Sequence, residues 1–188
     1  MRWLLKSVRF FSSCEKLARD AKRVAGRFIS MMELGMRIVE AAWPDHRETV
    51  VAMFREYAAS INADICFHGF EEELASLPGK YACPAGCVLL AFVNDDLAGC
   101  GAMRPLAEGA CEMKRLYVRP GFRGRDIGRE LAEALIEKAR VAEYQTMRLD
   151  TLATMTTAQA LYATLGFKPT AAYYNNPIAG TVYLELAL

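Results

Sequence analysis

The stretch from Cys111 to Ala139 limits the fold of this 188-residue chain more than any other part of it. It begins with "CEMKRLYV", in which apolar and polar residues alternate as in a half-buried strand. It ends in a segment whose apolar residues recur at helical spacing on one face: Ile127, Leu131, Leu135 and Ala139. Between the two stands "RGRDIG", a basic turn with two glycines. The stretch therefore predicts a strand, a turn and a helix in direct succession.

The turn has the composition of an anion-binding site. The first amides of a helix are unpaired and carry a partial positive charge. Gly124 lets a ligand approach the main chain, Arg123 and Arg125 add charge, and Gly128 keeps the helix thin on that side. The phosphate-binding signatures G-x-x-x-x-G-K-[ST] and G-x-G-x-x-G are both missing. Pyrophosphate is the favoured ligand, and the alternative is a solvated helix cap.

Charge is unevenly distributed along the chain. Residues 1–30 hold eight Lys/Arg and two acids, which leaves fifteen Lys/Arg and twenty acids in residues 31–188. The mildly acidic body argues against nucleic-acid binding, and no apolar run is long enough for a membrane span. Residues 1–30 are expected to be a basic amphipathic extension, with 31–188 as the folded domain. The extension is either an added helix, a targeting or membrane-surface helix, or the product of an early start codon, because Met31 and Met32 follow it.

Cysteine and histidine usage predicts no metal site. Cys83 and Cys87 bracket "PAG", but with only two histidines the chain lacks a clear zinc quartet. We expect reduced thiols, mostly in the core of a cytoplasmic protein. The six cysteines are Cys14, Cys66, Cys83, Cys87, Cys100 and Cys111.

The remaining pattern is that of a mixed α/β domain. Apolar periodicity and turn residues predict, in order, a strand from 36, a helix from Pro44, a short helix 70–77, a hairpin 87–103, the strand 111–118, helix 124–143, strand 147–152, helix 155–165, and strands near 167–174 and 180–187.

The helix that ends at Gly166 supplies a second motif, "LYATLGF". Together the two motifs make residues 36–188 resemble the GNAT superfamily of acyl-CoA-dependent N-acyltransferases. That family's pyrophosphate loop reads [QR]-x-x-G-x-[GA] after a strand ending in L-x-V, and "LYV" and "RGRDIG" stand in these places. Its L-Y-x-x-x-G-F corresponds to "LYATLGF".

Two residues depart from the family pattern. Asp126 stands where the family usually has glycine, and Met155 stands where many members have an asparagine that touches the cofactor arm. Thr154 or Thr156 would take over that hydrogen bond. Both departures bear on affinity for the cofactor. The Asp126 carboxylate repels a pyrophosphate unless it is turned outward, and Met155 cannot make the contact of the asparagine.

The resemblance implies an α/β (α+β) fold with a central mixed, mostly antiparallel sheet, splayed between strands 4 and 5 and flanked by helices. It implies that acetyl-CoA lies in the opening and gives its acetyl group to a primary amine of a small molecule or peptide by direct attack. The alternative is a non-catalytic acyl-CoA-binding sensor. The implied cofactor-binding residues are Leu116, Tyr117, Val118, Arg123, Gly124, Arg125, Asp126, Ile127 and Gly128.

The resemblance also suggests roles in catalysis. The Leu116 amide would stabilise the oxyanion of the intermediate and Tyr162 would protonate the departing thiolate, although Tyr162 also fits a core position. Glu112 is the candidate base, unless it simply pairs with Lys114. The candidate acceptor contacts are His68, Tyr173 and Tyr174, the tyrosines being equally compatible with a strand end. The two C-terminal strands would support a homodimer.

Overall fold

The computed structural model describes residues 35–61, 69–107 and 109–188. The expected basic extension over residues 1–30 and the candidate His68 lie outside these residues. By its internal contacts the chain divides into two units, Met1–Arg37 with Val93–Asp96 and Ile38–Phe92 with Leu97–Leu188. The site described below belongs entirely to the second unit. Among the described helices, none is long and apolar enough to cross a membrane.

The described residues form a seven-stranded sheet with the order β1-β2-β3-β4-β5-β7-β6. β3 and β4 are antiparallel, as are β5 and β7, and β6 and β7, whereas β4 and β5 are parallel. This confirms the predicted mixed, mostly antiparallel sheet. The strands are β1 Met36–Glu40, β2 Cys87–Val93, β3 Asp96–Pro105, β4 Ala110–Val118, β5 Thr146–Leu152, β6 Lys168–Pro169 and β7 Thr181–Ala187.

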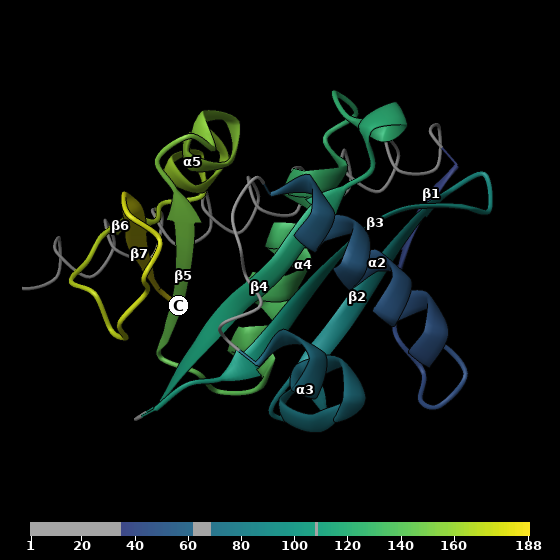
Figure 1. Cartoon of the computed structure of the whole chain (residues 1–188), viewed down its shortest axis with the longest axis horizontal. Coiled ribbons are helices and arrows are strands. Elements are labelled where there is room, and N and C mark those ends of the chain that lie inside the picture. The colour runs from purple at the N-terminus through teal and green to yellow at the C-terminus, as the bar shows by residue number, and fades with distance from the viewer. Residues whose placement is uncertain (1–34, 62–68, 108) are drawn as a thin grey trace, which may run out of the picture. The chain divides into compact units, whose positions relative to one another are not determined.

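Helices flank the central strands (Figure 1). One face of β2 and β3 packs on α2 and α3 through a buried cluster that includes Val50, Phe54, Leu74, Val88, Leu90 and Cys100. The other face packs on α4, where Leu131 and Leu135 lie over Gly99 and Gly101 of β3. Burial on both faces explains why β2 reads as a nearly continuous apolar run. The helices are α2 Arg47–Ser60, α3 Phe70–Ala75, α4 Ile127–Val141 and α5 Thr156–Thr164, with short turns η2 Gly79–Tyr81 and η3 Pro120–Phe122.

The parallel ladder between β4 and β5 is short. It pairs Ala110 to Glu112 with Thr146 to Arg148 and then ends, although β4 continues to Val118 and β5 to Leu152. Beyond this point the two strands separate, as the predicted splay requires. The edge of β4 that faces β5 is therefore open to an extended ligand.

A β-bulge interrupts β4 opposite Gly101. Cys100 pairs with Tyr117 and Ala102 with Lys114, so that Arg115 and Leu116 together face one residue of β3. Arg115 has φ +58°, in the left-handed region that non-glycine residues rarely adopt. The sequence carries no signal for this bulge, because the residue that adopts the unusual conformation is an arginine.

Some element boundaries differ from the sequence-based expectation. α4 begins at Ile127 rather than at 124, because Gly124 and Asp126 have φ +77° and +56° and cannot continue into the helix. α2 begins at Arg47, after Pro44. The expected strand over 167–174 is reduced to β6, because only Lys168 and Pro169 pair with β7.

The packing of β3 under the bulge predicts that Gly99→Ala is destabilising. A Cβ at Gly99 would lie 2.6 Å from the Tyr117 carbonyl oxygen, a main-chain atom that cannot move without disturbing β4. We expect a loss of about 1–3 kcal/mol in the free energy of unfolding, measured by urea denaturation. Gly121→Ala is the control, since its Cβ would meet nothing within 4 Å and its φ is not left-handed. Equal stability of the two variants would contradict this account of the packing.

Candidate active site

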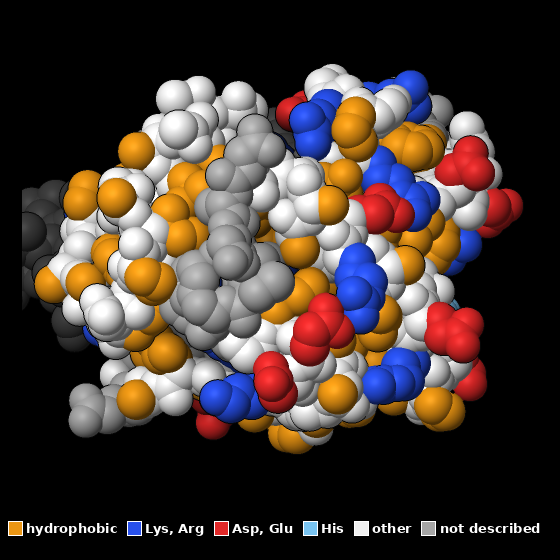
Figure 2. Space-filling view, viewed as in Figure 1, with side chains coloured by type: hydrophobic (Ala, Val, Ile, Leu, Met, Phe, Trp, Pro, Cys, Tyr) orange, Lys and Arg blue, Asp and Glu red, His pale blue; other side chains and the backbone are white. Residues whose placement is uncertain are grey.

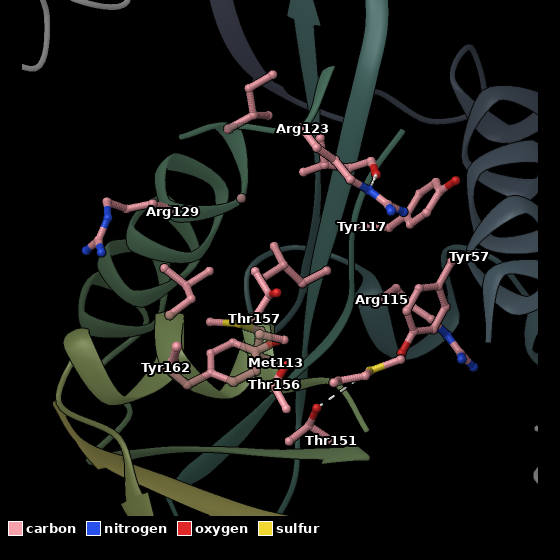
Figure 3. A pocket seen from close by; sticks show the side chains of 18 of the residues that line it. Tyr57, Met113, Arg115, Tyr117, Arg123, Arg129, Thr151, Thr156, Thr157 and Tyr162 are labelled. Carbon is pink, nitrogen blue, oxygen red and sulfur yellow. Dashed lines mark hydrogen bonds between the residues drawn. The ribbon is translucent and has the colours of Figure 1, made fainter. Parts of the chain in front are cut away.

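A cleft of about 690 Å³ opens where β4 and β5 separate (Figure 3). Its walls come from the end of β4, the following turn, the start of α4, the end of β5, the start of α5, and Tyr57 of α2. Most of the predicted site residues line it: Leu116, Tyr117, Val118, Arg123, Gly124, Asp126, Ile127, Gly128 and Tyr162. The other described candidates, Arg125, Glu112, Tyr173 and Tyr174, are not among the lining residues.

The start of α4 offers unpaired amides to the cleft. No side chain caps this helix, and its first main-chain bond runs from the Glu130 amide to the Asp126 carbonyl. The N–H groups of Ile127, Gly128 and Arg129 have no acceptor among the described residues, and all three residues line the cleft. Such a helix start attracts an anion through its free N–H groups and its dipole.

The glycines of the turn have different roles. Gly124 has φ +77°, and a Cβ there would meet nothing within 4 Å, so glycine serves the backbone conformation and leaves the approach open. A Cβ at Gly128 would make only ordinary contacts with Val118 and Leu161. The packing of the described residues therefore does not require glycine at position 128. Asp126, exposed in a left-handed conformation, occupies the kind of position that glycine favours.

The start of α5 also faces the cleft without a side-chain cap. Thr154, Met155 and Thr156 all line the cleft, together with Thr157. The side-chain amide of Gln159 donates to the carbonyls of Leu152 and Ala153, at 2.8 and 3.1 Å, and fixes the turn that precedes the helix. Both threonines considered as substitutes for the family's asparagine are therefore present at the cleft.

Tyr162 lies in α5 with its ring in the cleft wall beside Met113 and Thr156 (Figure 3). Its side chain is buried, with 7% of the residue exposed, and packs edge-on against Phe167 at 5.7 Å. Its hydroxyl has no hydrogen-bond partner among the described residues. Burial raises the pKa of Tyr162 above its ordinary value, so the hydroxyl keeps its proton at neutral pH.

Glu112 is fully buried and already bonded. Arg104 donates to one oxygen at 2.7 Å, Tyr173 donates its hydroxyl to the other at 2.8 Å, and Lys114 lies 3.7 Å away. Burial, followed by the charge of Glu112, raises the pKa of Tyr173. The rings of Tyr173, Tyr174 and Tyr183 pack against one another. This arrangement is compatible with a structural role for Glu112 and Tyr173, although the shortest cation contact of Glu112 is with Arg104 rather than Lys114 and Tyr173 lies between β6 and β7 rather than at a strand end.

An ion pair that the sequence did not single out spans the separated strands. Lys114 Nζ of β4 lies 2.8 Å from Asp150 Oδ1 of β5, and both residues line the cleft. Burial tends to raise the pKa of Asp150, but the Lys114 charge and hydrogen bond outweigh it and lower that pKa. Lys114 and Glu112 are two residues apart on one strand, so their side chains are on the same face of the sheet. This was the only sequence signal for the role of Lys114, and nothing in the sequence indicated Asp150 as its partner.

Tyr57 of α2 is a further cleft residue, which the sequence did not single out. It packs edge-on against Tyr117 at 6.2 Å. Burial raises the pKa of Tyr57 to about 12.

Among the residues that the structure describes, no group of three His, Cys, Asp or Glu side chains could hold a metal ion. Cys87, Cys100 and Cys111 are free and buried, whereas Cys83 is exposed.

Comparison with known proteins identifies the family. The sequence pattern of the acetyltransferase (GNAT) family matches residues 36–167. The chain belongs to this family. An uncharacterized N-acetyltransferase of Schizosaccharomyces pombe is 39% identical over 147 residues, which cover 77% of this chain and 90% of the relative. The predicted GNAT N-acyltransferase domain is therefore confirmed, and with it acyl transfer as the class of reaction.

Solved structures support the same fold. An acetyltransferase from Streptococcus agalactiae superimposes with a TM-score of 0.68 at 19% identity, over 82% of this chain and 99% of that one. The paiA N-acetyltransferase from Thermoplasma acidophilum, solved in complex with coenzyme A, superimposes with a TM-score of 0.63 at 18% identity, over 81% of this chain and 99% of that one.

The Lys114–Asp150 pair makes a prediction about pH and stability. Because the folded-state pKa of Asp150 is below its usual 3.8, its stabilisation is present above that pH and is lost as the pH falls through the folded-state value. We expect Asp150→Asn to lose about 2 kcal/mol or more at pH ~7, since a largely buried Lys114 loses its carboxylate partner at 2.8 Å and keeps only the longer contact with Glu112 at 3.7 Å.

The difference between wild type and Asp150→Asn should shrink when urea denaturation is repeated below pH 3.8. Asp95→Asn is the matched control, since its ion pair with Arg37 is exposed and should contribute little at any pH. A difference for Asp150→Asn that does not change with pH would contradict the assigned ionisation.

Proposed function

We propose that this protein transfers the acetyl group of acetyl-CoA to a primary amine of a small molecule or peptide. The observation that carries the proposal is the uncapped start of α4, whose free amides line a cleft that also holds the open edge of β4 and Tyr162. The Thermoplasma acidophilum structure, of the same fold, contains coenzyme A. The relatives are named as acetyltransferases, which gives no support to a non-catalytic sensor.

The cofactor has a natural path along this cleft. Its pyrophosphate would accept from the amides of Ile127, Gly128 and Arg129, with Arg123 beside them. The Arg123 side chain is exposed and anchored by a bond from Nε to the Val118 carbonyl at 3.1 Å. The pantetheine arm would pair with the main chain from Leu116 to Val118, as an added strand does. The α5 threonines also line this cleft.

The reaction needs three groups of the protein: a donor to the oxyanion, a proton donor for the thiolate and a proton acceptor for the amine. The neutral amine attacks the thioester carbonyl carbon, a C–N bond forms, and the carbonyl oxygen becomes an oxyanion that the Leu116 amide would stabilise. The intermediate then collapses, the C–S bond breaks, and Tyr162 would donate its proton to the departing thiolate. The proton that the amine loses would pass toward Asp150, the carboxylate in the cleft wall next to Lys114. Asp150 is itself bonded to Lys114 and Asn176, but it lines the cleft, whereas Glu112 has both oxygens bonded and does not line it.

A direct test of the function is release of coenzyme A thiol from acetyl-CoA in the presence of a broad panel of amines. Thiol release that depends on an amine, with a matching acetylated product in mass spectra, would support the enzyme. Binding of acetyl-CoA without release for any amine would favour the sensor. The acceptor itself, a cytoplasmic location and a homodimer stay predictions.

Tyr162→Phe tests the proton donor. Phenylalanine keeps the ring contact with Phe167 but removes the hydroxyl, so acetyl-CoA binding should persist while turnover falls by about 10²-fold. The measurement combines calorimetry with steady-state thiol release. Tyr144→Phe is the control, because that hydroxyl bonds to the Ala85 carbonyl and Tyr144 does not line the cleft. Unchanged turnover in Tyr162→Phe would remove Tyr162 from the mechanism.

Gly124→Glu tests the pyrophosphate site. The substitution places a carboxylate beside the free amides and strains a backbone with φ +77°, so affinity for coenzyme A should fall by about tenfold or more. Gly121→Glu adds the same charge three residues earlier, at an exposed glycine that does not line the cleft. Calorimetric titration with coenzyme A measures the affinity of each variant. Equal affinities in the two variants would count against the assignment.

A further inference from the structure

Arg115 is a charged residue at the bulge of β4, and 8% of it is exposed. Its φ of +58° belongs to a conformation that arginine adopts only when its surroundings impose it. The bulge lies at the point where the cleft is lined by Arg115 and Leu116. The contacts that impose this conformation therefore also determine how β4 presents its main chain to the cleft.

The guanidinium of Arg115 is held by Glu73 of α3. Two parallel bonds join them, Nε to Oε1 at 3.2 Å and Nη2 to Oε2 at 2.7 Å. Tyr81 donates its hydroxyl to Glu73 Oε1 at 2.8 Å and fixes the carboxylate in turn. A planar, two-pronged pair of this kind restricts orientation as well as distance.

Aromatic rings enclose the same guanidinium. Its central carbon lies 5.0 Å from the ring centre of Phe70, 5.6 Å from that of Tyr57 and 5.9 Å from that of Phe54. These rings come from α2 and α3, so both helices fix one side chain of β4. The contacts combine cation–π attraction with exclusion of water, which strengthens the pair with Glu73.

The main chain of Arg115 is held as well. Cys100 Sγ of β3 donates to the Arg115 carbonyl oxygen at 3.3 Å. That oxygen and the Leu116 N–H belong to one planar trans peptide group, in which C=O and N–H point in opposite directions. Fixing the carbonyl toward Cys100 therefore directs the Leu116 N–H away from Cys100.

We propose that Glu73 and Arg115 are positioning residues, which hold the β4 bulge so that the Leu116 N–H meets the carbonyl oxygen of the bound thioester. The inference rests on the proposed function. Neither residue needs to touch the reacting atoms, since their effect passes through the peptide group between Arg115 and Leu116. Loss of the pair should reduce polarisation of the thioester and turnover, while the distant amides of α4 still bind the pyrophosphate.

The test is isotope-edited infrared spectroscopy of acetyl-CoA labelled at its carbonyl carbon and bound to the full chain. A hydrogen bond to the carbonyl oxygen lowers its stretching frequency relative to free acetyl-CoA. We expect Glu73→Gln to lose most of this lowering and about tenfold or more of its turnover, with the dissociation constant of coenzyme A changed by less than about threefold.

The matched control is Glu71→Gln. Glu71 lies in the same helix and pairs with an arginine, Arg55 of α2, at 2.8 Å, but both side chains are more than half exposed. Figure 2 shows acidic and basic side chains interspersed over the surface of α2 and α3. This variant should match wild type in frequency, turnover and affinity. Tyr81→Phe removes one donor to Glu73 and should shift frequency and turnover in the same direction as Glu73→Gln, but less.

The outcomes separate the two proposals. If wild type fails to bind acetyl-CoA, or binds it with no lowering of the frequency, the proposed function fails at Leu116. If wild type shows the lowering and Glu73→Gln retains it with wild-type turnover, the positioning role is overturned. Loss of coenzyme A affinity and turnover together in Glu73→Gln would also overturn it, because that pattern indicates general damage to the fold. If Glu73→Gln does not fold, an unchanged frequency and turnover in Tyr81→Phe overturns the role.

Discussion

The separation of β4 from β5 beyond Glu112 and Arg148 is the constraint on which the site depends. The two strands are parallel neighbours, and their divergence opens the cleft and exposes one edge of β4. It also brings the starts of α4 and α5 to the same cleft, because each helix follows the end of one of the diverging strands. The Lys114–Asp150 pair bridges the gap at its narrow end and balances the charge there.

Buried carboxylates around the cleft are each paired with a cation. Glu73 bonds to Arg115, Glu112 to Arg104 and Asp150 to Lys114. Burying an ionised group is costly unless it is paired and hydrogen-bonded, and the tyrosine hydroxyls at Glu73 and Glu112 complete that requirement. The pairs join β4 to α3, β3 and β5, so they stabilise the arrangement around the cleft rather than any single element.

The positive end of the cleft is built differently. Its main attraction for an anion is the free main-chain N–H groups at the start of α4, which no side chain caps. The side chains there carry both signs, with Arg123 and Arg129 next to Asp126. Since amides do not change with residue type, the departure from the family pattern at Asp126 leaves the basic design of the site intact.

The local features of this protein were determined by its sequence. The apolar alternation of β4, the glycine of the turn and the periodic face of α4 predicted a strand, an anion-binding turn and a helix, because each depends on residues close together in the chain. "LYATLGF" placed Tyr162 on a helix, and the family resemblance placed that helix beside the turn. The resemblance also gave the predicted cofactor-binding residues, and all of them except Arg125 line the cleft.

Only the tertiary structure decided the partners of the charged residues. The sequence made Glu112 the candidate base, but Arg104 of β3 and Tyr173 of the segment between β6 and β7 bond to its two oxygens. Arg115 adopts a left-handed conformation because Glu73, more than forty residues earlier, and three aromatic rings hold it there. Apart from the Arg104–Glu112 pair across one hairpin, these contacts join residues that are remote in sequence, and no local pattern records which remote partner will be adjacent once the chain has folded.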